Sequence, residues 1–288
     1  MAASLRVYLF GEFRAERDGT HIRANDWHTR QARQLFKLLL TERGRSVSTS
    51  SLTSCLWPAF PDTAHKTLRS AVHALRSVLE PDRAPYAASR FVLRTAAGYA
   101  LHVPSNTAIW IDTIEFERLL DQAANTPPSH QLPLLTAALH LYTGDYLAED
   151  EAESWTVSER QRLRDRYLGA AAAAATWHTN AKQHDMAIAV SRAALHVDPS
   201  SEPLYRALMH AQSAQGDTAA ALHTFERCRR TLAEQWGADP DPQTLDLHTR
   251  ILKGEHAQQS PSVLVAPIEH AGTIPQIGES VPFIGRST

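Results

Sequence analysis

The chain has 288 residues, 43% of them hydrophobic and 21% charged, with a formal net charge of −2 at pH 7. This length suits two domains with separate cores, and the composition is ordinary for a soluble globular protein. No apolar run approaches the roughly 18–20 residues of a membrane span, the first ten residues lack signal-peptide features, and the two cysteines form neither a disulfide framework nor a zinc signature. These features predict a cytoplasmic protein with no membrane partner.

Charge is distributed unevenly along the chain. Residues 1–104 contain 15 Lys and Arg against 8 Asp and Glu, a net charge of +7, whereas residues 105–288 contain 14 basic and 23 acidic residues, a net charge of −9. A basic part joined to an acidic part indicates a nucleic-acid contact on one side only. Chance variation in composition would produce the same imbalance, so charge alone leaves both explanations open.

The N-terminal part begins with strand patterns at 5–10 and 12–15, followed by an Asp18-Gly19 turn and a third short segment at 21–23. A helix is predicted over 29–40 from its apolar periodicity. Its buried face is expected to consist of Ala32, Leu35, Phe36 and Leu39, and its outward face of Arg30, Arg33, Gln34 and Lys37.

Two more helices and a hairpin follow. The second helix is predicted to begin with Ser48 as its N-cap and to stop before Pro58, and the third to begin with Asp62 as its N-cap and to end near residue 79. Strands at 91–95 and 99–103 are joined by a short turn in which Gly98 can take a positive φ. The order of sheet, three helices and hairpin predicts a winged helix.

The third helix carries the candidate DNA-reading surface. With Leu68 pointing inward and an advance of about 100° per residue, the outward positions and their flanks are Lys66, Arg69, Ser70, His73, Arg76 and Ser77. This stripe contains no acid before Glu80. Lys and Arg bind guanine or phosphate, and Ser fits close to the DNA backbone. A solvated face of an ordinary helix is the alternative, but the lack of acids favours DNA.

The hairpin adds Arg90, Arg94 and Thr95 beside a tight turn. In a winged helix this element contacts the adjacent minor groove or the phosphates. Arg30, Arg33 and Lys37 on the first helix could also meet phosphates, although a role in solubility explains them better.

Beyond residue 104 the pattern is nearly all helical and contains an internal repeat. Ala187-Ile188 matches Ala221-Leu222, and Ala194 matches Cys228, each pair 34 residues apart. This period, with small residues at the packing points, is the tetratricopeptide (TPR) signature, in which helical hairpins bury their apolar faces by stacking. The chain is therefore predicted to be mostly α-helical with a small β component, a winged helix-turn-helix followed by an α-helical, TPR-like repeat domain.

Several spaced motifs resemble a known family. Leu5-Arg-Val-Tyr-Leu-Phe-Gly-Glu-Phe, Leu56-Trp57-Pro58, the segment from Lys66 to Arg76, and Gly98-Tyr-Ala-Leu are similar to the OmpR/PhoB-type winged helix of the Streptomyces antibiotic regulatory protein (SARP) activators. The resemblance implies promoter binding at direct repeats, by a homodimer or by copies arranged head to tail. It also implies that the loop around Trp57–Pro61 faces RNA polymerase, whereas a side chain that fills the core at the end of the second helix is the slightly better interpretation of Trp57 itself.

The acidic part resembles the bacterial transcriptional activation domain that accompanies this winged helix. The likeness rests on Val197-Asp-Pro-Ser-Ser-Glu-Pro, Gly216-Asp-Thr-Ala-Ala-Ala-Leu and Leu232-Ala-Glu-Gln-Trp-Gly-Ala-Asp-Pro. The predicted domains are a DNA-binding domain at 1–104, an activation domain at 109–253 and a flexible linker at 254–288. The last residues, 281–288, resemble the entry to an ATPase module. The activation domain also contains a group of five acidic residues, which is interpreted as a solvated loop or as a protein-contact surface. Its members are Asp145, Glu149, Asp150, Glu151 and Glu153.

No motif supports catalysis. The sequence has no phosphate loop, no HExxH, no GxSxG elbow and no Cys/His set with zinc spacing. We therefore expect no enzyme activity, no cofactor and no metal. The predicted function is that of a sequence-specific DNA-binding transcriptional regulator, with activation and contact to RNA polymerase implied by the family. The alternative is a protein-interaction scaffold, or the N-terminal part of a larger signalling ATPase regulator.

Overall fold

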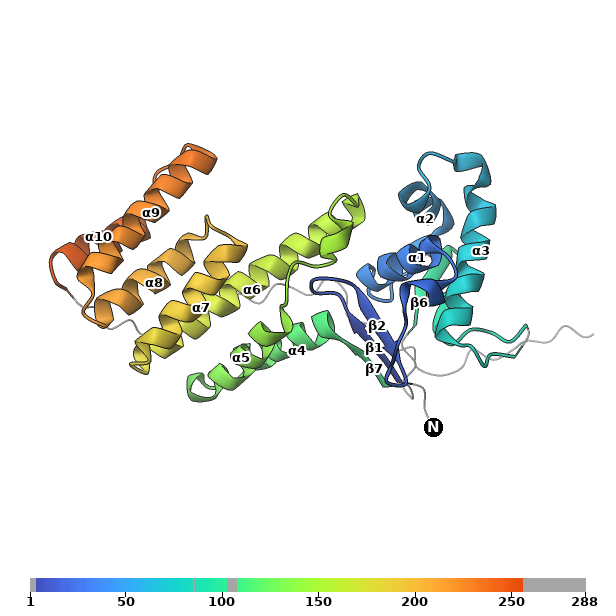
Figure 1. The fold of residues 1–288 in the computed structure, drawn as a ribbon, viewed down its shortest axis with the longest axis horizontal. Helices are drawn as coiled ribbons and strands as arrows, with labels where there is room; N and C mark the ends of the chain where they lie inside the picture. The colour runs from blue at the N-terminus through green and yellow to red at the C-terminus, as the bar shows by residue number, and fades with distance from the viewer. Residues whose placement is uncertain (1–3, 85, 103–107, 256–288) are drawn as a thin grey trace, which may run out of the picture.

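The computed structural model describes residues 4–84, 86–102 and 108–255 (Figure 1). The predicted linker and ATPase-like end therefore lie outside the described residues, except for 254 and 255. The strands are β1 (Ser4–Tyr8), β2 (Arg14–Arg17), β3 (Thr20–His21), β4 (Val47–Ser48), β5 (Val92–Arg94), β6 (Gly98–Leu101) and β7 (Ala108–Ile111). The helices are α1 (Arg30–Thr41), α2 (Thr49–Leu56), α3 (Pro61–Leu79), α4 (Asp112–Ala124), α5 (Gln131–Leu141), α6 (Ser154–Asn180), α7 (His184–Val197), α8 (Glu202–Ala214), α9 (Thr218–Trp236) and α10 (Pro242–Leu252), with 3₁₀ turns η1 (Ala24–Trp27), η2 (Pro128–His130) and η3 (Ala148–Asp150).

The winged helix predicted from the sequence is present. Three helices, α1, α2 and α3, pack between a four-stranded sheet of order β3-β2-β1-β7 and a three-stranded sheet of order β4-β6-β5. The predicted Ser48 cap of α2 is confirmed, because its hydroxyl accepts from the Ser51 amide at 3.0 Å. Thr29, predicted as the first residue of its helix, is the N-cap of α1, and its hydroxyl accepts from the Ala32 amide at 3.1 Å. Each cap satisfies an amide that the first helical turn leaves unpaired.

The predicted start of the third helix is wrong by two residues. Phe60 is the N-cap of α3 and Pro61 is its first helical residue, so Asp62 lies inside the first turn. Proline suits this position because it has no amide hydrogen to satisfy and its φ is already helical. The apolar face of α3 lies on the side predicted from Leu68, and Ala64, Leu68, Val72, Leu75 and Leu79 are all buried there.

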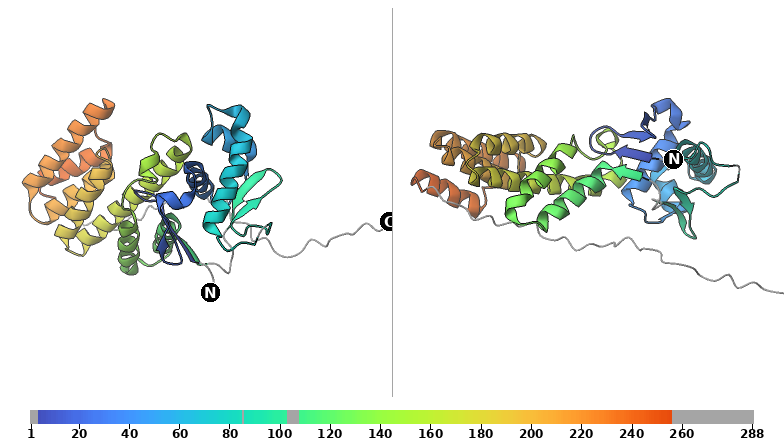
Figure 2. Two further views of the ribbon diagram at one scale, coloured as in Figure 1. Left: turned by 45° about the vertical axis from the view of Figure 1, so that its right-hand side comes forward. Right: turned by 90° about the horizontal axis from the view of Figure 1, so that it is seen from below.

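The C-terminal part is an array of helical hairpins (Figures 1 and 2). The 34-residue repeat is confirmed, since Ala187 and Ala194 of α7 and their counterparts Ala221 and Cys228 of α9 are each 0% exposed. Small side chains at these points let neighbouring helices approach closely. In both figures the array extends away from the winged helix on the side opposite α3, which leaves α3 at the other end of the molecule.

The two parts are joined by a strand that the sequence did not reveal. β7 lies beside β1 in parallel, with Leu5 opposite Ile109 and Val7 opposite Ile111, and so completes the N-terminal sheet immediately before α4 begins. The buried carboxylate of Asp112 then accepts hydrogen bonds from the amides of Leu9 and Phe10 at 2.8 and 2.9 Å. The first helix of the C-terminal part is thereby fixed to the end of β1.

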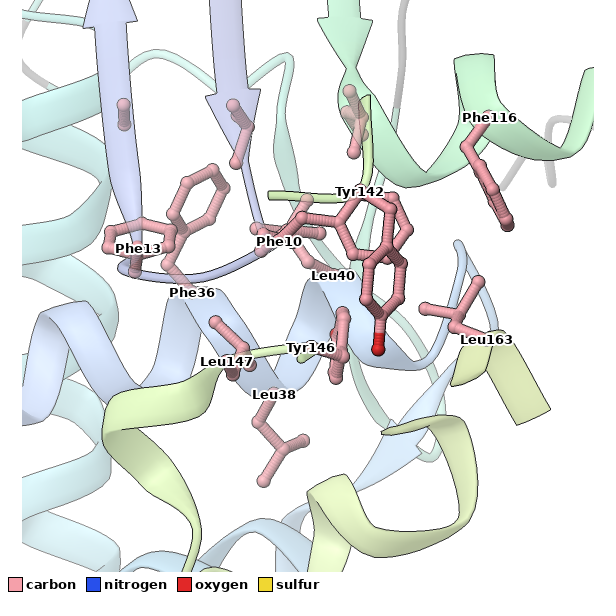
Figure 3. Close-up of a cluster of buried hydrophobic side chains, with 14 of the residues drawn as sticks. Phe10, Phe13, Phe36, Leu38, Leu40, Phe116, Tyr142, Tyr146, Leu147 and Leu163 are labelled. Carbon is pink, nitrogen blue, oxygen red and sulfur yellow. The ribbon is translucent and has the colours of Figure 1, made fainter. Parts of the chain in front are cut away.

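A shared core fills the junction. Phe10 from the segment after β1 packs against Phe116 of α4 and against Tyr142, with ring centroids 5.2 and 4.8 Å apart (Figure 3). Tyr142 in turn stacks on Tyr167 of α6 at 4.1 Å. The fully buried Tyr146 exchanges a hydrogen bond with Thr41 of α1 at 2.6 Å. One continuous apolar cluster therefore runs from the winged helix into the helical array.

Ion pairs also connect the winged helix to the helical array, and one of them shows that the expectation for Lys37 was wrong. Its side chain was expected to point outward, but it is 1% exposed and pairs with Glu149 and Asp150. Arg33 also pairs with Glu149, at 3.0 Å. The 3₁₀ turn that carries these carboxylates covers the polar face of α1, a contact between residues more than 110 positions apart that helical periodicity cannot reveal.

A second set of pairs lies at the end of α1. The Arg43 guanidinium binds Glu117 of α4 and Glu159 of α6, each at 2.5 Å. Burial raises the pKa of both carboxyl groups, but the hydrogen bonds and charges of Arg162 and Arg43 hold it below its ordinary value. Both carboxylates therefore stay ionised at neutral pH.

Four of the five carboxylates of the acidic set have partners within the protein, so most of the set is neither a solvated loop nor a free contact surface. Asp145 is bound by Arg164 and accepts from the Tyr142 hydroxyl, and Glu153 accepts from Trp155 at 3.1 Å. With Glu149 and Asp150 committed to α1, Glu151 is the exposed member for which the described residues supply no partner.

Candidate nucleic-acid interface

The outer face of α3 carries four exposed members of the predicted site. Lys66, Arg69, Ser70 and His73 all lie outside the core, on the side opposite Leu68. Two of them form hydrogen bonds within the helix: Arg69 Nε donates to the His65 carbonyl at 3.4 Å and the Ser70 hydroxyl to the Lys66 carbonyl at 3.3 Å. Within the described ranges no carboxylate pairs with this row. Its positive charge is therefore available to an external anion.

Arg76 and Ser77 lie lower on the helix and are half-buried. The Arg76 guanidinium donates from Nε and Nη2 to the Val92 carbonyl of β5, at 3.1 and 2.8 Å. Burial lowers the pKa of Arg76, which nevertheless stays far above neutrality in an arginine. The geometry makes this side chain a brace between α3 and the hairpin, so that the two candidate DNA-binding elements keep a fixed distance.

The hairpin presents Arg90 and Arg94 on the surface, with Thr95 half-buried at its turn. The Thr95 hydroxyl accepts from the Gly98 amide at 3.0 Å and hydrogen-bonds the Ser46 hydroxyl at 2.5 Å. The turn is therefore tied both to itself and to the loop that precedes α2. This arrangement holds Arg94 on the β5–β6 ladder, whereas Arg90 lies just before β5 and its guanidinium is 3.4 Å from the Glu80 carboxylate.

Gly98 is required here for a reason other than the one predicted. It does not have a positive φ; instead, a Cβ atom at this position would lie 2.0 Å from the Val47 carbonyl oxygen of β4 and 2.8 Å from the Thr49 amide. Only a residue without a side chain allows β4 and β6 to approach this closely.

Two residues of this surface were not recognised from the sequence. Glu80 follows α3, is 6% exposed, and accepts from the Ser89 hydroxyl and the Arg90 amide, so it closes the loop between α3 and β5. Arg45 lies just before the strand that pairs with the hairpin, its side chain is 70% exposed, and it reaches Glu42 at 3.2 Å. The sequence signal that could have identified Arg45 is its positive charge close to the predicted Ser48 N-cap.

Neither a metal-ligand cluster nor a membrane-spanning helix is found in the described part of the chain. There, no group of three or more His, Cys, Asp or Glu side chains is arranged to hold a metal ion. None of the helices described has the length and apolar character needed to cross a bilayer. The loop that was expected to face RNA polymerase contains one buried and one exposed aromatic side chain. Trp57 is 8% exposed and belongs to the core, as the interpretation of it as a core residue predicts, whereas Phe60 is 67% exposed.

Two family models match the chain, in the same order as the two structural parts. The model described as "Transcriptional regulatory protein, C terminal" matches residues 27–101, and "Bacterial transcriptional activator domain" matches residues 111–252. The first range contains α1 to β6 and the second contains α4 to α10.

Curated relatives and a solved structure agree with these matches. The chain is 28% identical to the regulatory protein DnrI of Streptomyces peucetius, over 87% of this chain and 93% of the relative. It is 28% identical to the regulatory protein AfsR of Streptomyces coelicolor, over 99% of this chain but only 28% of that longer protein. A structure of EmbR from Mycobacterium tuberculosis, in complex with a low-affinity phosphopeptide, superposes with a TM-score of 0.75 at 25% identity, covering 88% of this chain and 66% of EmbR.

Proposed function

Since the chain belongs to the SARP-type transcriptional regulators, with an OmpR/PhoB-type winged helix followed by a bacterial transcriptional activator domain, we propose that it binds promoter DNA sequence-specifically and activates transcription in the bacterial cytoplasm. The observation that carries the proposal is the outer face of α3 from Lys66 to His73, which contains no acid; the exposed Asp62 lies one turn before it. Four exposed side chains, Lys66, Arg69, Ser70 and His73, lie there without any carboxylate partner among the described residues.

The proposed mechanism assigns these residues to the major groove. Arg69 and Lys66 supply donors for guanine O6 and N7 or for phosphate, and Ser70 and His73 supply shorter polar contacts at base edges. Ser77, half-buried one turn further on, lies at the margin of this surface. Arg76 acts by holding α3 against β5.

The hairpin is assigned a contact that does not depend on sequence. Arg90 and Arg94, with Thr95 at the turn, bind phosphates or the adjacent minor groove. Because Gly98 and Ser46 fix this turn to β4 and to the preceding loop, the hairpin keeps one position relative to α3. It therefore contributes affinity, and α3 contributes discrimination.

The finer parts of the proposal concern assembly and partners. We assign DNA binding to residues 1–104 and activation to residues 109–253, and we expect copies of the chain to occupy direct repeats as homodimers or head-to-tail arrays. The exposed Phe60 at the start of α3 is the side chain we assign to contact with RNA polymerase. Because the chain spans only 28% of AfsR, further activities of that longer relative are not transferred to it. We assign it no enzymatic activity.

The proposal is tested by selecting fragments of genomic DNA with the purified chain and measuring affinity over a range of salt concentrations. A regulator enriches particular promoter fragments, and the logarithm of its affinity falls linearly with the logarithm of salt concentration, with a slope that reflects several phosphate contacts. A protein-interaction scaffold enriches none. Absence of any salt-dependent preference among fragments would overturn the proposal.

A further inference from the structure

Arg17 is a cation on the inner side of the N-terminal sheet. Because side chains alternate along a strand, Arg17 lies on the same face of β2 as Ala15, which is 1% exposed. In register it stands opposite Leu5 of β1, which is 4% exposed. Arg17 itself is half-buried. A charged side chain directed toward the apolar side of a sheet is costly unless a polar partner receives it.

The partner of Arg17 is the C-terminal end of α3. Its Nη1 atom donates to the carbonyl oxygen of Val78, and the two elements lie side by side at this point (Figure 1). Val78 carries one of the last four carbonyls of the helix, which have no amide partner within it. Val78 is 4% exposed, and Pro81, just beyond the helix, has no amide hydrogen to offer. Arg17 therefore caps a buried carbonyl, where the helix dipole also favours a cation.

The backbone that carries Arg17 is held in place by the turn that follows it. Asp18 and Gly19 have φ values of 50° and 76°, which suit a tight two-residue hairpin turn. The Asp18 amide donates to the Ser4 carbonyl at 2.9 Å, and the Asp18 carboxylate accepts from the Ser4 amide at 2.8 Å. The guanidinium of Arg17 therefore extends from a fixed point of the sheet.

The helical turn that Arg17 caps joins the two candidate DNA-binding elements. Arg76 of this turn donates to the Val92 carbonyl of β5, and the Glu80 amide donates to the Arg76 carbonyl at 2.9 Å. The Glu80 carboxylate accepts from the Arg90 amide at 2.9 Å. Unwinding of this turn would remove the side-chain contacts that hold the hairpin against α3. The exposed row at 66–73 lies nearer the start of the helix, above buried residues of its own.

We infer that Arg17 is a positioning residue for DNA binding. By capping the end of α3 it keeps the last helical turn ordered, and through Arg76 it holds the β5–β6 hairpin at one distance from the helix. It acts through Arg76 and not by contact with DNA. The inference rests on the proposed function and deepens it. Because the hairpin is assigned phosphate contacts, the capping affects affinity for all sequences and leaves discrimination unchanged.

The test uses three variants of the full chain. Arg17→Met keeps an unbranched stem but removes the donor, whereas Arg17→Lys keeps a cation that can donate to the same carbonyl. Arg6→Met is the matched control, because Arg6 lies on the adjacent strand β1 and on the outer, exposed face of the same sheet. Affinity is measured for the selected promoter fragment and for an unrelated duplex.

We expect Arg17→Met to bind both duplexes about tenfold more weakly, because only the molecules whose last helical turn is ordered are competent to bind. The ratio of the two affinities should stay at its wild-type value. Arg17→Lys should recover most of the loss, and Arg6→Met should bind within about twofold of the wild type.

Double variants separate positioning from general stability. If Arg17 acts through Arg76, Arg17→Met adds little to the loss of affinity caused by Arg76→Met. It should multiply the loss caused by Arg69→Ala, which acts at a separate point of the surface. A residue that only stabilises the fold would leave the affinity of the folded chain unchanged in every background.

Hydrogen exchange of the chain without DNA gives a readout that does not depend on the proposed function. The Glu80 amide should exchange about tenfold faster in Arg17→Met and at the wild-type rate in Arg6→Met. Unchanged exchange of this amide, unchanged affinity of Arg17→Met, an equal loss in Arg6→Met, or a loss that multiplies with that of Arg76→Met would overturn the inference. Failure of the wild type to prefer any DNA fragment would instead overturn the proposed function, whatever the exchange rates.

Discussion

The ammonium nitrogen of Lys37 in α1 lies 2.6 Å from a carboxylate oxygen of Asp150 in η3, and the two side chains are only 1% and 6% exposed. This buried pair connects the DNA-binding part to the helical array across 113 residues of sequence. The attraction between two such charges is strong, but the loss of their hydration is costly, so the pair contributes mainly when both members are present.

Lys37→Met is therefore expected to lower the free energy of unfolding by about 3 kcal/mol, because it leaves Asp150 buried without its cation. Adding Asp150→Leu should recover a large part of this loss. Chemical denaturation measures both effects. The control is Arg229→Met, which removes an exposed pair with Glu226 at 2.8 Å and should cost less than about 1 kcal/mol. Equal losses in Lys37→Met and in the control would contradict the role assigned to the buried pair.

Asp112 should give the junction a distinctive pH dependence. Burial raises its pKa to about 6, against the opposing hydrogen bonds from the amides of Phe10, Leu9 and Thr113. Between about pH 4 and 6 the folded state therefore holds a proton that the unfolded state releases, so the contribution of Asp112 to stability rises as pH falls through this window.

The measurement compares the wild type with Asp112→Asn, whose side chain does not titrate. Relative to Asp112→Asn, the free energy of unfolding of the wild type should rise by on the order of 2 kcal/mol when the pH is lowered from 7 to 4. The carboxylates with lowered pKa, such as Glu117 and Glu159, are common to both proteins and cancel. A difference that stays constant with pH would show that Asp112 titrates normally.

Gly98→Ala should unfold the hairpin locally or destabilise the whole chain by more than about 3 kcal/mol, because its Cβ would lie 2.0 Å from the Val47 carbonyl oxygen. DNA affinity should fall for all sequences together, since the hairpin arginines would lose their support. Gly169→Ala in α6 is the control. A Cβ there meets nothing within 4 Å, and alanine in a helix interior should stabilise by about 0.5–1 kcal/mol. Thermal unfolding distinguishes the two, and similar shifts in both would contradict the close approach of β4 and β6.

The two candidate DNA elements should respond differently to substitution. Arg69→Ala or His73→Ala is expected to reduce discrimination between the selected site and unrelated DNA by about 1–3 kcal/mol. Arg94→Ala should instead weaken binding to all sequences about equally and reduce the salt slope by about one. Parallel binding titrations on both duplexes check this. If Arg94→Ala alone altered discrimination, the roles of α3 and the hairpin would have to be exchanged.

The sequence predicts what depends on local pattern. The apolar faces of α1 and α3, the Ser48 cap and the 34-residue repeat all follow from periodicity and capping chemistry, because each is determined by local sequence pattern. The outward direction of Lys66, Arg69, Ser70 and His73 follows from the same geometry. The roles of these residues toward DNA remain predictions.

What the sequence did not predict depends on contacts between distant segments. Lys37 is buried because η3 folds over it, and β7 is a strand because β1 offers it an unpaired edge. A parallel pairing across about 100 residues leaves no signal in a local window. Gly98 shows the same limit, since the close carbonyl belongs to β4, some 50 residues earlier.

The central claim is that the face of α3 reads DNA sequence, and it is tested most directly by the affinity of the full chain for a selected promoter fragment and for an unrelated duplex at physiological salt. We predict that the wild type binds the promoter fragment at least 10³-fold more tightly and that Arg69→Ala removes a large part of this ratio. Equal affinity of the wild type for both duplexes would contradict the claim.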